Sequence, residues 1–137
     1  MGLADDVRIR FDHVSIAVNS IDRAMAFFQR YFPTHPRSIK QPSEQASGGF
    51  IWQDCYIGGT AVEFIEELPG QQGFIPRFLR RHGEGMHHIS FEVDRLEPVV
   101  AALKAGGVRV KGRPKAVSLE AQTTRFTPKS VAALKTL

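Results

Sequence analysis

The chain has 137 residues, and its 18 Lys and Arg against 14 Asp and Glu give a formal net charge of +4 at pH 7. This length and a hydrophobic content of 42% are typical of one ordinary folded domain, while the charge is too small to indicate a nucleic-acid partner. There is no apolar run near the ~18 residues of a membrane span and no secretory signal pattern, so we expect a cytoplasmic protein without a membrane contact.

Two segments of the chain repeat each other. Residues 11–18 (FDHVSIAV) and 86–93 (MHHISFEV) share a His at the third position, a Ser at the fifth and a final Val. Such an internal repeat indicates two copies of one structural unit. We therefore expect a single domain over residues 1–137, built from a first module at 8–75 and a second at 84–137.

The first module opens with alternating apolar residues at 11–18, which predict a strand. Apolar residues at helical spacing then predict a helix over 20–31, with Asn19 as its N-cap and its end before Pro33. Three strands and a short helix follow, and Gly58-Gly59 is typical of a two-residue hairpin turn between the second and third strands. The expected ranges are 36–41, 49–57, 60–67 and 75–81.

The second module repeats this order. A strand at 86–93 leads into a helix over 95–105, with Asp94 as N-cap and Gly106-Gly107 at its end. Residues 130–137 have no clean alternation, so strand and helix both remain open there. With further strands expected at 108–111 and 122–127, the pattern predicts an α+β fold of two β-α-β-β-β modules.

Three side chains stand out as metal ligands. The repeat makes His13 and His88 equivalent, and two imidazoles with a carboxylate are a common donor set for a divalent cation. Glu63 lies in the middle of an apolar strand, where an ionised carboxylate is costly unless it is paired or ligates an ion. A lone strand His is usually only a core or rim residue, and His87 must face away from His88 because neighbours alternate across a strand.

Residues 11–18, 62–65 and above all the stretch Gly83-Glu84-Gly85-Met86-His87-His88-Ile89 resemble the vicinal oxygen chelate (glyoxalase/bleomycin resistance/dioxygenase) superfamily. Within it, the sequence is most similar to methylmalonyl-CoA epimerase-like and glyoxalase-like proteins. The resemblance implies a cup-shaped mixed sheet around one divalent ion (Co, Mn, Ni, Zn or Fe), with His13, Glu63 and His88 as ligands. It also implies a homodimer.

The chemistry implied by this resemblance is isomerase, lyase or epimerase action on a small α-oxo or anionic acyl-CoA thioester substrate, through an enolate that the metal stabilises. Members of the family have a fourth ligand, Glu or Gln, on the last strand. The two repeated segments are 75 residues apart, so the counterpart of Glu63 would be position 138, one past the last residue of the sequence. Alignment of residues 128–130 with the Pro-Lys-Ser stretch near the end of the family's sequences gives Leu137 instead. Neither alignment supplies a carboxylate. We expect the second module to stop at or just before that ligand.

The epimerases also have a Glu that acts as a base near the second strand. Glu44 is the nearest match for this catalytic role, although it lies about three residues out of register and fits a solvated loop residue better. The incomplete ligand set leaves two alternatives open. One is a non-catalytic, antibiotic-type binding protein, and the other is a non-haem iron dioxygenase with two His and one carboxylate.

The basic residues and the cysteine each have a structural interpretation as well as a functional one. Basic side chains could meet the phosphates of an acyl-CoA or be ordinary surface charge; they are Arg77, Arg80, Arg81, Lys111, Arg113 and Lys115. The single cysteine, Cys55, excludes a disulfide within the chain and is expected to be inert core rather than a nucleophile.

Overall fold

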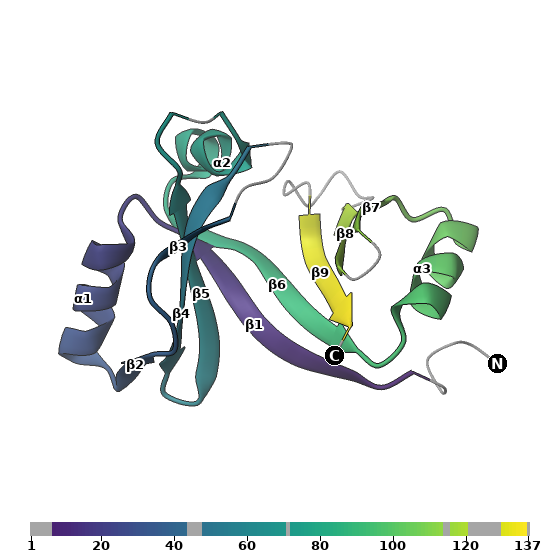
Figure 1. Cartoon of the computed structure of the whole chain (residues 1–137), viewed down its shortest axis with the longest axis horizontal. Coiled ribbons are helices and arrows are strands. Elements are labelled where there is room, and N and C mark those ends of the chain that lie inside the picture. Colours follow the sequence, from purple (N-terminus) through teal and green to yellow (C-terminus); the bar gives the residue numbers. More distant parts are fainter. Residues whose placement is uncertain (1–6, 44–47, 71, 114–115, 121–129, 137) are drawn as a thin grey trace. The chain divides into compact units, whose positions relative to one another are not determined.

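The structure is a computed structural model that describes residues 7–43, 48–70, 72–113, 116–120 and 130–136, with the backbone alone from residue 111 on. It is a mixed α+β protein, and its chain divides into two compact units (Figure 1). One unit is His13–His87, and the other combines Met1–Asp12 with His88–Leu137.

The elements follow the predicted order of strand, helix and strands in both halves of the chain. In chain order they are β1 (Ile9–Ala17), α1 (Ile21–Tyr31), β2 (Thr34–Pro36), β3 (Gln41–Ser43), β4 (Phe50–Ile57), β5 (Thr60–Glu67), α2 (Phe74–His82), β6 (Gly85–Val93), α3 (Leu96–Ala105), β7 (Val110–Arg113), β8 (Ala116–Glu120) and β9 (Ser130–Thr136). None of the helices in the described residues is long and apolar enough to cross a membrane.

In the unit His13–His87 the strands pair in the order β2-β4-β5-β1, and β3 adds to β4. β4 and β5 form the predicted hairpin, in which Gly58 turns the chain with a φ of 59°, a left-handed conformation that suits glycine. β1 runs parallel to β5, with Ser15 opposite Glu63. This sheet is therefore mixed, and its register decides which side chains of β1, β4 and β5 share a face.

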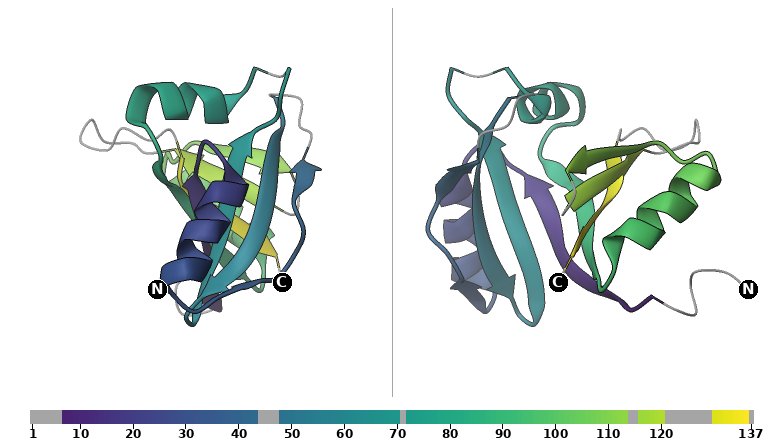
Figure 2. Two further views of the ribbon diagram at one scale, coloured as in Figure 1. Left: turned by 90° about the vertical axis from the view of Figure 1, so that its left-hand side faces the viewer. Right: turned by 45° about the vertical axis from the view of Figure 1, so that its right-hand side comes forward.

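One face of this sheet is apolar and carries α1, which lies along the strands in Figure 2. Ile21 and Met25 of the helix pack there with Val62 and Phe64 of β5. The predicted helix is confirmed, but its N-cap is Ser20, whose side chain accepts a hydrogen bond from the Arg23 amide. The prediction of Asn19 as cap was wrong by one residue because both types can cap and only the backbone geometry selects between them.

The opposite face of the same sheet carries α2. Ile75 of α2 packs on Ala17 and Ile65, and aromatic side chains surround this second cluster, namely Phe50, Trp52, Phe74 and Phe78. α2 agrees with the predicted short helix. Because α2 covers the Ala17 and Ile65 positions, the polar residues nearer the start of β1 lie outside this apolar cluster.

The second unit has its own core and sheet. β9 runs parallel beside β6 and is followed across the sheet by β8 and β7. Leu96 of α3 packs with Val93 of β6 and with partly buried apolar neighbours. Figure 2 shows α3 as the green helix beside the strands of this unit. The first residues of β1 also belong here, since Arg10 forms an ion pair with the buried Glu92 and the Arg8 amide donates to Asp94.

That last contact corrects the second predicted cap. The N-cap of α3 is Arg95, whose side chain does not cap the helix, while the Asp94 carboxylate accepts a hydrogen bond from the Arg8 amide. In place of the expected strand 36–41 there are two short strands, β2 ending at Pro36 and β3 beginning at Gln41. Residues 130–136 are strand rather than helix, and the expected strand 122–127 lies outside the described residues.

Truncation of the buried Phe64 should destabilise the protein much more than truncation of an exposed phenylalanine. Phe64 is 0% exposed and Phe27 is 52% exposed. We expect Phe64→Ala to lower the free energy of unfolding by ~3–5 kcal/mol, measured by urea denaturation, because it leaves a cavity under α1. The matched variant Phe27→Ala should cost less than ~1 kcal/mol, and equal losses would contradict this assignment of the core.

Candidate metal centre

The face of the sheet opposite α1 carries a polar group of side chains. His13 and Ser15 lie two residues apart on β1 and therefore share a face, while Val14 and Ile16 between and beyond them pack toward α1. Glu63 of β5 lies opposite Ser15 in the register and projects to the same side. The alternation of two neighbouring strands thus delivers an imidazole, a hydroxyl and a carboxylate to one place.

The geometry of this group is set by two contacts to one oxygen. Ser15 Oγ donates to Glu63 Oε1 at 2.8 Å, and His13 Nε2 lies 3.7 Å from that oxygen. The second distance exceeds a hydrogen bond. Two atoms that each bind one ion at ~2.1 Å lie roughly 3–4 Å apart, so this spacing fits two ligands of one cation.

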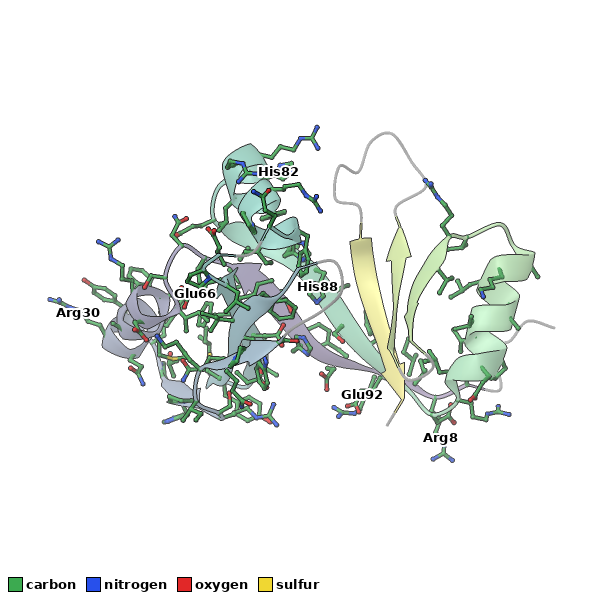
Figure 3. All side chains as sticks on the ribbon, turned by 45° about the horizontal axis from the view of Figure 1, so that its top comes forward. Arg8, Arg30, Glu66, His82, His88 and Glu92 are labelled. Atoms are coloured by element: carbon green, nitrogen blue, oxygen red, sulfur yellow. The ribbon has the colours of Figure 1, made fainter. Side chains whose placement is uncertain are left out.

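His88 of β6, labelled in Figure 3, is the third member of the group. One ligand atom from each of His13, Glu63 and His88 lies within 4.8 Å of the others, and all three side chains are half-buried. Two imidazole nitrogens are borderline ligands and a carboxylate oxygen is a hard one, and this mixed set suits first-row divalent metals. The structure therefore brings together the three residues that the sequence singled out, and their donor set fits a divalent ion.

The neighbouring His87 packs against α2 and does not belong to the ligand group, as strand alternation predicts. Its ring lies 5.2 Å from the Phe74 ring and 4.9 Å from the Phe78 ring, both on α2. Burial among these rings lowers the pKa of His87 from 6.5 to about 4, because the charged form loses its hydration. His87 is therefore a neutral packing residue at pH 7.

Asp54 is a carboxylate at this site that sequence reasoning missed. It lies opposite Glu63 in the β4–β5 register, and its neighbour Cys55 packs on the other face with Val62. Asp54 thus shares the face of Glu63, although it is outside the three-residue ligand group. Alternation in the expected strand 49–57 predicts that Asp54 and Cys55 lie on opposite faces. Only the pairing of β4 with β5 puts Asp54 beside Glu63.

Cys55 is buried at 0% exposure, as expected of inert core. Burial, with a smaller contribution from the charge of Asp54, raises the pKa of the Cys55 thiol to about 11. Almost no thiolate is present at neutral pH, which argues against a nucleophile.

The remaining predicted positions fall into two groups. Glu44 and Leu137 lie outside the described residues. On β9 the register pairs Ser90 with Ala133, as β1 pairs Ser15 with Glu63. Ala133, rather than the position given by the repeat offset, is therefore the counterpart of Glu63. β9 as described contains no Asp, Glu or His.

Among the basic residues, Arg77, Arg80 and Arg81 are exposed on α2. Arg80 and Arg81 lie in its last turn, where the helix dipole favours positive charge. This position accounts for them as surface charge without requiring a phosphate. Lys111, Arg113 and Lys115 have no described side chains.

The fold and the site together define the class of the protein. Residues 12–127 match the model of the Glyoxalase/Bleomycin resistance protein/Dioxygenase superfamily, and the chain belongs to this family. Among curated relatives, it is 31% identical over 102 residues to human mitochondrial methylmalonyl-CoA epimerase, covering 73% of this chain and 55% of the relative. It is 30% identical over 104 residues to the ethylmalonyl-CoA/methylmalonyl-CoA epimerase of Cereibacter sphaeroides, covering 75% of each.

Solved structures have the same fold. Methylmalonyl-CoA epimerase from Mycobacterium tuberculosis has a TM-score of 0.74 at 16% identity, covering 92% of this chain and 86% of the other. The Streptomyces coelicolor enzyme in complex with 2-nitronate-propionyl-CoA has a TM-score of 0.70 at 20% identity, covering 93% and 96%. The chain spans only about half the length of the human relative that it matches.

The lowered pKa of His87 predicts a loss of stability in acid. As the pH falls from 6.5 toward 4, the unfolded chain binds a proton at this residue before the folded chain does, so the free energy of unfolding decreases. We expect chelator-treated protein to lose up to about 3 kcal/mol through His87 across this window, and no more through it below the folded pKa.

The variant His87→Phe should remove this loss, measured as the difference from the unsubstituted protein in urea unfolding between about pH 7.5 and about pH 4. The carboxylates titrate in both proteins, so their contribution to the pH dependence of stability cancels when the two proteins are compared. His82→Gln, at an exposed histidine on α2, is the matched control and should follow the unsubstituted protein. An identical pH dependence of the His87→Phe variant would show that His87 is not buried as a neutral group.

Proposed function

We propose that the protein is a metal-dependent epimerase, or a closely related isomerase or lyase, acting on an acyl-CoA thioester or another small α-oxo compound. The observation that carries this proposal is the group His13, Glu63 and His88, with ligand atoms within 4.8 Å of one another. The similarity of the chain to methylmalonyl-CoA epimerases supports the same reaction class.

In this proposal, His13 and His88 hold a divalent ion through imidazole nitrogens and Glu63 through a carboxylate oxygen. Once bound, such an ion supplies Lewis-acid polarisation of a carbonyl oxygen, which lowers the barrier to loss of the neighbouring proton. The protein's own part is to fix these ligands on three strands, β1, β5 and β6. Side chains on strands are more rigidly placed than side chains on loops.

A proton must also leave and return to the substrate carbon, and this step needs an acid–base side chain. Of the carboxylates in the described residues, Asp54 is placed for it, since it lies opposite Glu63 on the same face. Residues directly opposite in an antiparallel pair have Cβ atoms ~5 Å apart, which is within reach of a ligand held at Glu63. Glu44 remains the second candidate for the base.

A second function is favoured by one specific observation. The register pairs Ser90 with Ala133, and the described strand β9 has no carboxylate or imidazole, so this strand offers no counterpart of Glu63. A non-catalytic small-molecule binding protein on this fold would have no need of that ligand. We keep as further proposals that residues 1–137 act as one domain of two modules and that two chains form a homodimer.

The metal site is tested by titration of chelator-treated full-length protein with cobalt chloride. We expect about one ion per chain, and His88→Ala or Glu63→Gln should weaken binding by more than ~100-fold because each removes one of three ligands. Calorimetry or the visible spectrum of bound cobalt gives the dissociation constant.

Glu67→Gln is the matched control for Glu63→Gln. Glu67 is on the same strand and the same face, four residues farther on, and it is exposed. It should bind cobalt as the unsubstituted protein does. Equal weakening by Glu67→Gln, or no cobalt binding at all, would refute the site.

The reaction is tested by exchange of the α-proton of methylmalonyl-CoA with solvent deuterium, followed by mass spectrometry. We expect exchange with the cobalt-loaded protein, none after chelation, and a loss of at least ~100-fold in Asp54→Asn with cobalt affinity retained. Tight binding of the thioester without exchange, and unchanged by chelator, would favour the binding protein instead.

A further inference from the structure

One buried hydroxyl touches the metal-binding group without belonging to it. Ser15 is 0% exposed, and its Oγ donates to Glu63 Oε1 at 2.8 Å from the directly opposing position of the neighbouring strand. A serine hydroxyl is a poor ligand for a divalent metal beside imidazoles and a carboxylate. Its contact is therefore with the carboxylate itself.

This hydrogen bond has a direct consequence for the orientation of Glu63. The last torsion of a glutamate side chain is broad, so a free carboxylate rotates easily. A carboxylate offers about four lone-pair sites, so one bond accepted from Ser15 leaves the others for His13 or a cation. Because Ser15 is held within the sheet, the hydroxyl fixes one oxygen of Glu63 before any ion arrives.

The repeat supplies a natural comparison. Ser90 is the equivalent serine on β6 and is also buried, at 3% exposure, but the register places Ala133 opposite it instead of a carboxylate. The two serines have the same chemistry, similar burial and the same position after a histidine of the site. Only Ser15 has a glutamate as its cross-strand neighbour.

We propose that Ser15 is a positioning residue, which orients the Glu63 carboxylate for the divalent ion. This inference rests on the proposed metal site. Hydrogen-bond partners of metal ligands contribute to affinity by fixing the ligand's orientation, and their loss typically costs ~10–100-fold. With three protein ligands in the described group, the orientation of the single carboxylate carries a large share of the affinity.

The test compares Ser15→Ala and Ser90→Ala in full-length protein by cobalt titration. We expect Ser15→Ala to weaken cobalt binding ~10–100-fold and Ser90→Ala to change it less than ~3-fold, with both variants folded by circular dichroism. Ser15→Thr keeps a hydroxyl and should recover part of the affinity. Unchanged affinity in Ser15→Ala, or an equal loss in Ser90→Ala, overturns the inference.

A readout without metal separates this inference from the proposed function. In metal-free crystals, we expect Glu63 in one rotamer in the unsubstituted protein and in a different or a mixed rotamer in Ser15→Ala. If the unsubstituted protein binds no cobalt, the proposed site fails, whereas the role of Ser15 is still decided by this comparison. The same single rotamer in both crystals overturns the role of Ser15.

Discussion

The parallel pairing of β1 with β5 is the constraint on which the candidate site depends. It sets Ser15 opposite Glu63 and leaves His13 on the same face. A shift of one residue would turn Glu63 toward the apolar layer under α1 and move Phe64 to the polar side. The burial of Phe64 at 0% exposure therefore also holds the carboxylate in place.

One face of this sheet is packed with apolar side chains, and the other carries the polar side chains of the candidate site. α1 fills one face with aliphatic and aromatic side chains, while α2 packs on Ala17 and Ile65 of the other. Glu63 lies on this second face with Ser15 and His13 as polar neighbours of its carboxylate, which lowers the cost of an ionised Glu63 within an otherwise apolar strand. His87, one residue from His88, belongs to the packing on α2.

The repeat explains both the symmetry and the asymmetry of the site. Its two histidines and two serines occupy equivalent positions, yet the register gives Glu63 to Ser15 and Ala133 to Ser90. One half thus contributes a histidine, a carboxylate and the hydroxyl that orients it, and the other contributes a histidine. Because of this inequality, we propose a binding function as the alternative to the epimerase.

The sequence by itself determined the strand–helix order, the hairpin at Gly58-Gly59 and the three candidate ligands, because alternation and repeats are local patterns that the chain displays directly. It chose the wrong caps for α1 and α3, since Asn19 competes with Ser20 and Asp94 is engaged by Arg8. Only the tertiary structure decided that Ser15 donates a hydrogen bond to Glu63, that Asp54 lies opposite Glu63 and that Ala133 is paired with Ser90. These depend on which strands pair and in which register, and that choice is made by contacts between residues far apart in the chain.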